Sequence, residues 1–585
     1  MTDTAAMNRL WGELVVEELV RCGVTRFCLS SGSRSTPLTV AVAEHPRAEA
    51  VMHYDERGAA FFALGCARGS GKPAALVCTS GTAAANYLPA AVEASNAQVP
   101  LVVLTADRPP ELVDTGANQT IRQTGLYRNF VRWEHALPCP TPDVAPATLL
   151  TAIDHAVHQA QGPPAGPVHV NCPFREPLIA DCPDGMHSEY LSSVARWKAA
   201  QGPYTTYDRP QPPAPSQSGG QVPLSMEAKR VGLVVGCLGS PADRASVRSL
   251  AEAAGWPVLA DVTSGLRLGA GEVPVLVHYD SLLQSPSLAR ELRFDAVIHV
   301  GGAVTSKRLL EHFRRDPPAE YIHVAAHGVR YDPASCVSRR IVANIPEFCR
   351  HLTATATPQV DAKWTTRLQG ASKLVARMLD EFANESNTLS EPLLSRILSR
   401  DCPADHALFL GNSMPIRDMD AFAASDGSAA PVFANRGASG IDGNVATAAG
   451  IATGANSPVT AVLGDLAVLH DLNSLSLLRK APKPVVLVVV NNDGGGVFHF
   501  LPIAGYPEVF EPYFATPHGL RFERAAQMFG LAYASPKTAA EFREAYRELA
   551  NGNAPGLIEI DTDREENHRL HLRLQAQIVA VLERI

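Results

Sequence analysis

Short aliphatic runs that alternate with helix-like stretches constrain the fold of this 585-residue chain more than any other feature of its sequence. Unbroken runs of Val, Ile and Leu are typical of strands covered on both faces, and such strands occur mainly in parallel sheets. The runs, each followed by turn-forming residues, are AALVCTSGT (74–82), PLVVLTADR (100–108), RVGLVVGCLG (230–239), DAVIHVGG (295–302), HALFLGNS (406–413), VTAVLGD (459–465), PVVLVVVNND (484–493) and GLIEID (556–561). The pattern predicts an α/β fold with mostly parallel sheets flanked by helices.

The length of the chain and two breaks in this pattern predict three domains, because so long a chain does not build a single core. Residues 201–223 are rich in Pro, Ser, Gln and Gly without any period, which is typical of a linker. A weaker boundary near 355–365 precedes a long helical stretch. We expect domains at 1–190, 191–364 and 365–585, each with its own sheet.

Composition argues against several classes of protein. A net charge of −8 is unlike the basic face of a nucleic-acid-binding protein. Eleven cysteines at irregular spacings, without a CxxC pair, indicate reduced and buried thiols. The acidic, amphipathic residues 1–19 do not resemble a secretory signal, and the longest aliphatic run, 485–490, is too short to cross a bilayer. We therefore expect a cytoplasmic protein without a nucleic-acid or membrane partner.

Two successive strands of the last domain end in oxygen-bearing side chains, Asp465 and Asn492. Strand–helix–strand crossovers return parallel and usually adjacent, so these two ends should lie side by side. A carboxylate, an amide oxygen and the carbonyl of Gly494 are ligands that Mg²⁺ accepts while it holds a diphosphate. Glycines 494–496 would let the backbone approach the phosphates. Alternatively, Asp465 only caps a helix and the asparagines only form a turn.

The combination of GDL (464–466) with NN (491–492) resembles the diphosphate motif of the thiamine-diphosphate enzyme superfamily, which is usually written GDG followed by NN. Leu466 departs from the glycine of that motif. Leucine there changes packing rather than ligation, so Asp465 and Asn492 remain the expected ligands of Mg²⁺ or Mn²⁺.

Glu56 is the expected catalytic residue, because enzymes of this superfamily need a carboxylic acid that hydrogen-bonds the aminopyrimidine of the cofactor. It lies in DERGAAFFALGCAR (55–68), between an apolar strand at 50–53 and a helix of small residues, which resembles the first domain of the superfamily. Burial would favour the protonated carboxyl, which can donate. Alternatively, Glu56 is simply an acidic residue at a helix N-terminus, where a negative charge interacts favourably with the helix dipole.

Basic residues recur after predicted strands, where ligands of open α/β sheets bind. Guanidinium groups bind carboxylates in bidentate fashion, so several of them imply substrates with several carboxylates. Each residue alone could be an ordinary solvated side chain. The basic candidates are Arg34, Arg108, Lys307, Arg308, Arg417 and Arg436. The polar candidates beside them are Ser33, Asn118, Gln119 and Ser413.

Five motifs together resemble a narrower family, the 2-succinyl-5-enolpyruvyl-6-hydroxy-3-cyclohexene-1-carboxylate synthases of menaquinone biosynthesis. They are SGSRSTPL, DERGAAFFALG, TADRPPEL with GANQTI, GNSMPIRD and NRGASGIDG. The resemblance implies that 2-oxoglutarate is decarboxylated and that the succinyl carbanion equivalent adds to isochorismate. It also implies a homodimer or homotetramer in which the first domain of one subunit meets the last domain of another over the cofactor.

The resemblance further implies which residues hold the cofactor. Ile441 would be the apolar wedge between the two cofactor rings, although an isoleucine there could equally be ordinary core. The cofactor-binding set is Glu56, Ser413, Ile441, Gly464, Asp465, Leu466, Asn492, Gly494, Gly495, Val497 and Phe498.

Two alternatives remain open. An acetolactate-synthase-like enzyme or another 2-oxoacid decarboxylase would share the cofactor and the fold, but the many strand-end arginines argue against small, monoanionic substrates. A non-catalytic protein could retain the scaffold, because fold alone does not define function. The joint presence of Glu56, Asp465 and Asn492 argues against that alternative.

Overall fold

The computed structural model describes residues 3–181, 185–208, 228–271, 273–355 and 360–585. Most of the predicted linker, 209–223, and part of the second predicted boundary, 356–359, lie outside these residues. The chain forms two compact units. Among the described residues, the first unit comprises those within 1–209, 435–457 and 470–485, and the second comprises those within 210–434, 458–469 and 486–585.

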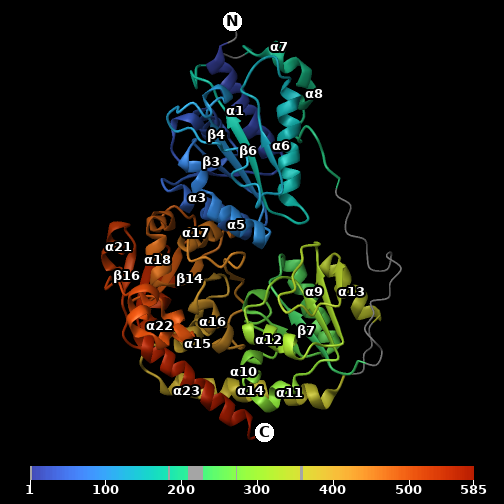
Figure 1. Ribbon diagram of the computed structural model, residues 1–585, viewed down its shortest axis with the longest axis vertical. Coiled ribbons are helices and arrows are strands. Elements are labelled where there is room, and N and C mark those ends of the chain that lie inside the picture. The colour runs from blue at the N-terminus through green and yellow to red at the C-terminus, as the bar shows by residue number, and fades with distance from the viewer. Residues whose placement is uncertain (1–2, 182–184, 209–227, 272, 356–359) are drawn as a thin grey trace. The chain divides into compact units, whose positions relative to one another are not determined.

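The first unit contains a six-stranded sheet in the order β2-β1-β3-β4-β6-β5, and all its neighbouring strands run parallel. Leu149 and Ile153 of α6 and Leu14 of α1 belong to its core, and Figure 1 shows α1 and α6 beside the strands. The strands are β1 (Arg26–Leu29), β2 (Glu49–Met52), β3 (Ala74–Cys78), β4 (Leu101–Asp107), β5 (Glu134–Ala136) and β6 (Pro167–Pro173). The helices are α1 (Thr4–Arg21), α2 (Thr36–Glu44), α3 (Glu56–Ser70), α4 (Thr82–Asn86), α5 (Leu88–Ala97), α6 (Pro146–Gln161), α7 (Ser188–Leu191), α8 (Ala195–Ala199), α17 (Asn444–Ala455) and α19 (Leu475–Leu478).

Helices α3 and α17 of the first unit pack with their backbones close together. A Cβ atom at Gly65 would lie 2.2 Å from the carbonyl oxygen of Thr447, and one at Gly450 would lie 2.1 Å from that of Phe62. Both positions therefore require glycine, which explains the small residues of the stretch that begins at Glu56.

The second unit contains two sheets. The five-stranded sheet has the order β11-β10-β9-β7-β8, and its neighbouring strands run parallel. Its strands are β7 (Val231–Val235), β8 (Val258–Ala260), β9 (Ala296–Val300), β10 (Glu320–Ala325) and β11 (Arg339–Val342). Its helices are α9 (Pro241–Ala254), α10 (Tyr279–Leu282), α11 (Pro286–Glu291), α12 (Lys307–Arg315) and α13 (Ile345–Thr355).

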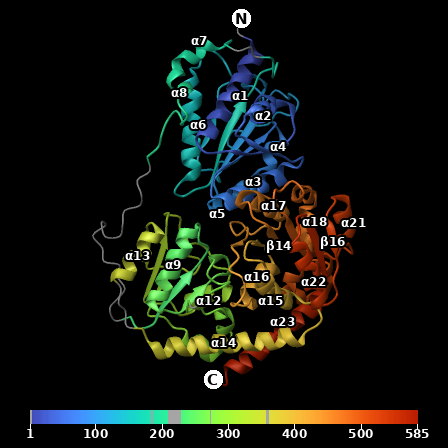
Figure 2. The same cartoon turned by 180° about the vertical axis from the view of Figure 1, so that it is seen from behind.

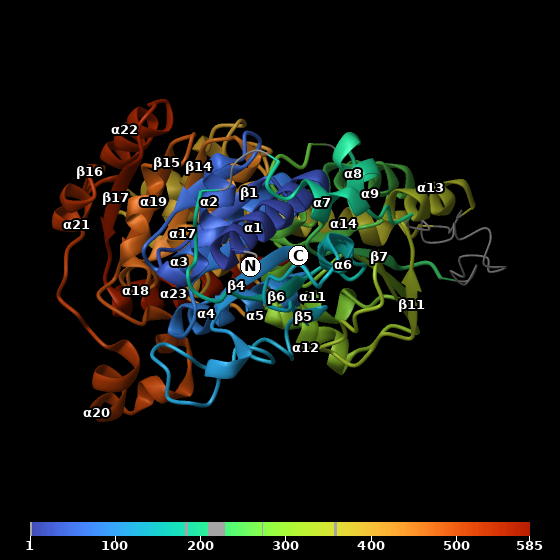
Figure 3. The ribbon, with the colours of Figure 1, turned by 90° about the horizontal axis from the view of Figure 1, so that it is seen from above.

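The other sheet of the second unit has the order β13-β12-β14-β15-β17-β16. Helix α14 contacts α23 below this sheet (Figure 2), and Figure 3 shows α20 lying away from β15 and β17. The strands are β12 (Ala407–Leu410), β13 (Val432–Phe433), β14 (Val459–Gly464), β15 (Val485–Asn491), β16 (Ala532–Ala534) and β17 (Gly556–Asp561). The helices are α14 (Ala362–Glu385), α15 (Glu391–Asp401), α16 (Met414–Phe422), α18 (Asp465–His470), α20 (Pro507–Phe510), α21 (Glu523–Met528), α22 (Ala539–Ala550) and α23 (Arg564–Leu582).

The described helices and cysteines test two expectations from the sequence, the absence of a membrane span and the burial of the thiols. No described helix combines the length and the apolar character that a membrane crossing requires. The prediction of uniformly buried cysteines is wrong: Cys237 is exposed, and Cys22 and Cys336 are partly exposed. Cys237 lies in the turn after β7, where the chain has left the interior of the sheet.

Candidate active site

Asp465 is the first residue of α18, directly after β14, and its side chain is 2% exposed. One carboxylate oxygen, Oδ1, accepts a hydrogen bond from the backbone N–H of Leu466 at 2.6 Å. The other, Oδ2, accepts from the N–H of Gly494 at 2.8 Å and lies 3.2 Å from Nε2 of His518. Burial raises the pKa of Asp465, and the two backbone hydrogen bonds oppose that effect. Asp465 therefore contacts both the first turn of α18 and the loop that follows the neighbouring strand β15.

Asn492 follows β15 and is 8% exposed. Its amide nitrogen Nδ2 donates to Oε1 of Glu391 at 2.9 Å. Its amide oxygen Oδ1 is buried and has no hydrogen-bond partner among the described residues. A buried polar atom without a partner is costly, and an amide oxygen beside a carboxylate is a donor pair that Mg²⁺ accepts. The residues present therefore fit a hard divalent cation.

Two of the three glycines that follow Asp493, Gly494 and Gly495, are required by backbone packing. Gly494 has a φ of +132°, and a Cβ there would lie 2.0 Å from the carbonyl oxygen of Ala515. A Cβ at Gly495 would lie 2.3 Å from the carbonyl oxygen of Phe514. The missing Cβ atoms of Gly494 and Gly495 would point at the backbone of residues 514–515, so close packing of these two segments requires glycine at both positions.

Other predicted residues follow the C-terminal ends of β12, β14 and β15, which are neighbours in this sheet. Ser413 precedes α16 with a φ of 73°, and its carbonyl oxygen accepts from Nη1 of Arg417 at 2.5 Å. Phe498 is half-buried and meets the ring of Phe514 edge-on. Gly464, Leu466 and Val497 are also partly exposed.

Lys307 and Arg308 lie on a different sheet, at the start of α12 after β9. Lys307 is 86% exposed and pairs with Glu311 at 3.3 Å, whereas Arg308 pairs with Asp280 at 2.6 Å. Within the described part of the chain, neither of them forms an ion pair with a residue at the end of β12, β14 or β15. Each of these two cations already has an acidic partner in its own part of the chain.

Glu56 is the first residue of α3, directly after the loop that follows β2. The helix is capped by Asp55, whose side chain accepts from the N–H groups of Arg57 and Gly58. The role of a helix-start cap therefore belongs to Asp55, which leaves the carboxyl of Glu56 available. The expected burial of Glu56 is not reached: it is half-buried, because β2 is the edge strand of its sheet and is itself largely exposed.

Arg34 and Arg108 lie close enough in the first unit to influence each other electrostatically. Burial, and then the charge of Arg34, lower the pKa of Arg108. Arg34 is buried and already donates to Phe174 O at 2.8 Å and to Glu176 Oε1 at 2.6 Å, so much of its hydrogen-bonding capacity is used within the chain. Its Nε atom is buried without a hydrogen-bond partner among the described residues.

Ser80 joins Arg108 to Gln119. Its hydroxyl accepts from Nη1 of Arg108 at 2.7 Å, and its carbonyl oxygen accepts from Nε2 of Gln119 at 2.9 Å. Ser33 and Asn118 are exposed. Sequence reasoning missed Ser80, although it stands in the Thr-Ser-Gly turn directly after β3.

Arg436 and Ile441 lie in a loop of the first unit that Glu93 holds in place. The carboxylate of Glu93 accepts from the N–H of Gly437 at 2.9 Å and from the N–H of Ala438 at 2.6 Å. Ile441 is 37% exposed, so the alternative that it is ordinary core is wrong. A hollow of about 190 Å³ beside this loop is lined by residues that include Phe61 and Glu93.

Glu391 and His518 are further residues at this site that the sequence did not indicate. Burial, and then the charge of Asp418, raise the pKa of Glu391 to about 7. Glu391 begins helix α15 and follows no strand, and His518 lies in a loop without a recognisable pattern. Neither position follows the strand-end rule that located Asp465 and Asn492.

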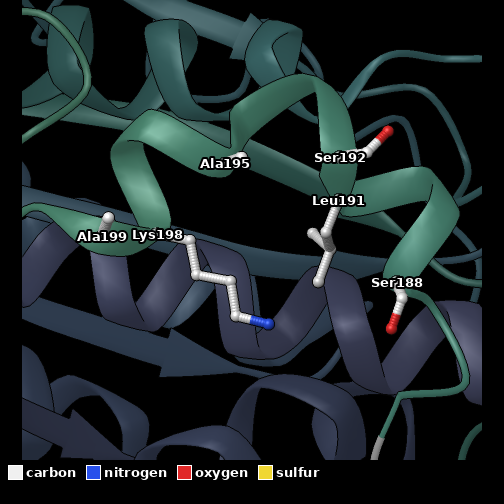
Figure 4. Close-up of a pocket in the computed structure, with 6 residues that line it drawn as sticks. All are labelled: Ser188, Leu191, Ser192, Ala195, Lys198 and Ala199. Atoms are coloured by element: carbon white, nitrogen blue, oxygen red, sulfur yellow. The ribbon is translucent and has the colours of Figure 1, made fainter.

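A second hollow, of about 350 Å³, lies over helices α7 and α8 (Figure 4). Its lining residues are Ser188, Leu191, Ser192, Ala195, Lys198 and Ala199. It contains none of the predicted site residues and only one charged side chain, so it is not the active-site candidate.

Comparisons with known families define the class to which this fold and site belong. Residues 10–126 match the family described as "Thiamine pyrophosphate enzyme, N-terminal TPP binding domain". Residues 188–410 match "Middle domain of thiamine pyrophosphate", and residues 429–560 match "Thiamine pyrophosphate enzyme, C-terminal TPP binding domain". The chain is an enzyme of the thiamine-diphosphate-dependent class.

Within this class, the chain is 49% identical to a 2-succinyl-5-enolpyruvyl-6-hydroxy-3-cyclohexene-1-carboxylate synthase of Rubrobacter xylanophilus, over 98% of each chain. It is 47% identical to the synthase of Salinibacter ruber, over 98% of this chain and 97% of the relative, and 42% identical to that of Chlorobium phaeobacteroides, over 99% of each. The chain belongs to the 2-succinyl-5-enolpyruvyl-6-hydroxy-3-cyclohexene-1-carboxylate synthase family.

Proposed function

We propose that this enzyme decarboxylates 2-oxoglutarate and adds the succinyl unit to isochorismate in a 1,4-addition, giving 2-succinyl-5-enolpyruvyl-6-hydroxy-3-cyclohexene-1-carboxylate. The observation that carries the proposal is the 49% identity that extends over 98% of both chains to a relative of that name. Thiamine diphosphate, when bound, supplies the electron sink for decarboxylation, while the protein supplies orientation and charge.

A divalent cation, Mg²⁺ or Mn²⁺, is proposed to link the protein to the diphosphate. Its ligands would be Asp465, Asn492 and the carbonyl of Gly494. The buried, unpaired Oδ1 of Asn492 supports this choice. The backbone around Gly464, Leu466 and Gly495, with the side chains of Val497 and Phe498, would line the diphosphate end of the cofactor.

Glu56 is proposed to hold the proton that the aminopyrimidine ring exchanges, and Ile441 to support the cofactor rings. The availability of the Glu56 carboxyl, with Asp55 as the helix cap, supports the first role. The partial exposure of Ile441 supports the second, because a wedge must present an apolar surface to a ligand.

Recognition of the substrate carboxylates is assigned to the strand-end cations and their polar neighbours. The mutual influence of Arg34 and Arg108 supports an anion site in the first unit. The proposed set is Ser33, Arg34, Arg108, Asn118, Gln119, Lys307, Arg308, Ser413, Arg417 and Arg436.

Replacing Arg417 or Arg436 by alanine should lower kcat/KM by about one to two decades, since a charge-assisted contact is worth roughly 1.5–3 kcal/mol. Thiamine diphosphate affinity should be unchanged, because neither residue is assigned to the cofactor. Steady-state kinetics and calorimetry measure both quantities. If all the proposed cations could be replaced without a kinetic effect, the assignment of polyanionic substrates would fail.

The active site is proposed to form between the domain at 1–190 of one subunit and the domain at 365–585 of another. The exposure of the edge strand beside Glu56 supports a covering partner. We expect monomers to be inactive, because each would hold an incomplete cofactor site. Analytical ultracentrifugation at the assay concentration checks this, and a fully active monomer would contradict it.

The reaction itself is tested by incubating purified protein with thiamine diphosphate, Mg²⁺, 2-oxoglutarate and isochorismate, followed by mass analysis of the product. We expect the named product and one CO₂ per turnover. Pyruvate in place of 2-oxoglutarate serves as the control, and turnover of pyruvate alone would support an acetolactate-synthase-like enzyme instead.

A further inference from the structure

Asn491 is the last residue of β15 and Asn492 follows it directly. Each asparagine donates a hydrogen bond to a different buried glutamate. Asn491 Nδ2 donates to Glu559 Oε1 at 2.6 Å, and Asn491 Oδ1 accepts from the N–H of Asp493 at 3.2 Å. Asn492 Nδ2 donates to Glu391 Oε1 at 2.9 Å, but its Oδ1 has no partner among the described residues. Of the two amide oxygens, only that of Asn492 remains available to a ligand.

The orientation of an asparagine amide decides whether it can bind a cation. The oxygen carries lone pairs that a cation accepts, whereas the NH₂ group presents only hydrogens. The two ends of the amide have nearly the same size, so packing alone does not distinguish them. An acceptor placed against the nitrogen does distinguish them, because a flipped amide would place its oxygen against that acceptor.

Glu391 is the acceptor that lies against the amide nitrogen of Asn492, and the surroundings of this amide are closely packed. Glu391 is 4% exposed, at the start of α15. On the other side, a Cβ at Gly496 would lie 2.7 Å from Asn492 Nδ2, so position 496 leaves room only for a hydrogen atom. The hydrogen bond from Asn492 therefore has a fixed direction in a closely packed environment.

We infer that Glu391 is a positioning residue, which binds Asn492 Nδ2 and thereby directs Oδ1 toward the divalent cation. The inference rests on the proposed metal site. A carboxyl oxygen accepts a hydrogen bond in either protonation state, so the role requires an acceptor at this place rather than a charge.

The surroundings of Glu391 indicate which substitution should preserve the role. Asp418 lies close to Glu391; its Oδ1 is 2.8 Å from His571 Nε2, whereas its Oδ2 is buried without a hydrogen-bond partner in the described chain. A glutamine at 391 could accept from Asn492 through its oxygen and donate to Asp418 through its nitrogen. A leucine could do neither.

The test is Mn²⁺ binding in the presence of thiamine diphosphate, followed by the electron paramagnetic resonance signal of free Mn²⁺, which requires no turnover. We expect Glu391→Leu to weaken Mn²⁺ binding by about tenfold or more, as is usual for partners of metal ligands. Glu391→Gln should bind Mn²⁺ as the wild type does. Wild-type affinity in Glu391→Leu, or equal losses in both variants, would overturn the inference. If Glu391→Leu does not fold, Glu391→Asp, whose shorter side chain withdraws the acceptor, replaces it.

A double-mutant cycle separates orientation from packing. In the Asn492→Asp background the side chain has two equivalent oxygens, so no orientation is needed. Adding Glu391→Leu there should cause no further loss of Mn²⁺ affinity. A further tenfold loss would show that Glu391 acts through packing and would contradict the inference.

Two further variants complete the design. Glu559→Leu removes the acceptor of Asn491 by the same substitution, and it should lower the melting temperature without changing Mn²⁺ affinity relative to the wild type. Asp465→Ala tests the metal site itself. If wild type and Asp465→Ala bind Mn²⁺ equally, the proposed metal site is wrong; if only the Glu391 variants are without effect, the site stands and the positioning role is wrong.

Discussion

Replacing Glu56 by glutamine should lower kcat by about two to four decades, the usual contribution of general acid–base assistance. Glutamine keeps the volume but cannot exchange a proton with the aminopyrimidine ring. The affinities for thiamine diphosphate and Mg²⁺ should change little, because Glu56 contacts neither the cation nor the diphosphate in the proposed arrangement. The loss should therefore appear in the chemical step and not in cofactor binding.

The measurement is the rate at which the thiazolium proton of bound cofactor exchanges with D₂O, read by quenched-flow NMR. The rate should fall in parallel with kcat in Glu56→Gln. Asp55→Asn is the matched control: it makes the same carboxyl-to-amide change one residue earlier, and asparagine still caps a helix. Exchange at the wild-type rate in Glu56→Gln would show that another acid serves the ring.

Replacing Asp465 by alanine should weaken thiamine diphosphate binding at ordinary Mg²⁺ concentrations by at least about a hundredfold, since a charged ligand between protein and cation is lost. The fold should survive, because the hydrogen bonds lost at Asp465 cost only about 1–3 kcal/mol each. Calorimetric titration with the cofactor measures the effect, and circular dichroism verifies the fold.

Asp493→Ala is the matched control for this prediction. Asp493 is a carboxylate in the loop after β15, which Asp465 contacts at Gly494, and its Oδ1 accepts from the N–H groups of His518 and Gly519 at 2.9 and 2.7 Å. It is not assigned to the cation, so its removal should leave cofactor affinity near that of the wild type. Unchanged affinity in Asp465→Ala would place the metal elsewhere.

The sequence predicted the central strands because buried parallel strands require long aliphatic runs. All eight runs are strands in the structure, as β15 (Val485–Asn491) illustrates. Strands such as β6 (Pro167–Pro173) and β10 (Glu320–Ala325) were not predicted, because His and other polar residues interrupt their apolar pattern. In β6 the polar side chains are hydrogen-bonded inside the core, as His169 is to Thr105 at 2.7 Å.

Candidate site residues could be predicted where a strand end fixes a position, which is why Asp465 and Asn492 were found. Partners from distant segments could not be predicted in this way. Glu391 is 101 residues from Asn492 in the chain, and Glu93 is 344 residues from Gly437. Their identification depends on tertiary contacts that no local pattern records.

The parallel pairing of the strands should affect both the folding rate of the enzyme and its inactivation by heat. Every parallel pair needs a crossover, so its contacts join segments far apart in sequence, and folding of such topologies is slow. Partly folded chains of this size expose apolar strands and aggregate. We therefore expect heat inactivation to be irreversible and governed by the unfolding rate. The half-life of the active enzyme then depends on the activation barrier to unfolding rather than on the equilibrium free energy of unfolding. Half-lives at a fixed temperature would then rank the variants better than melting points.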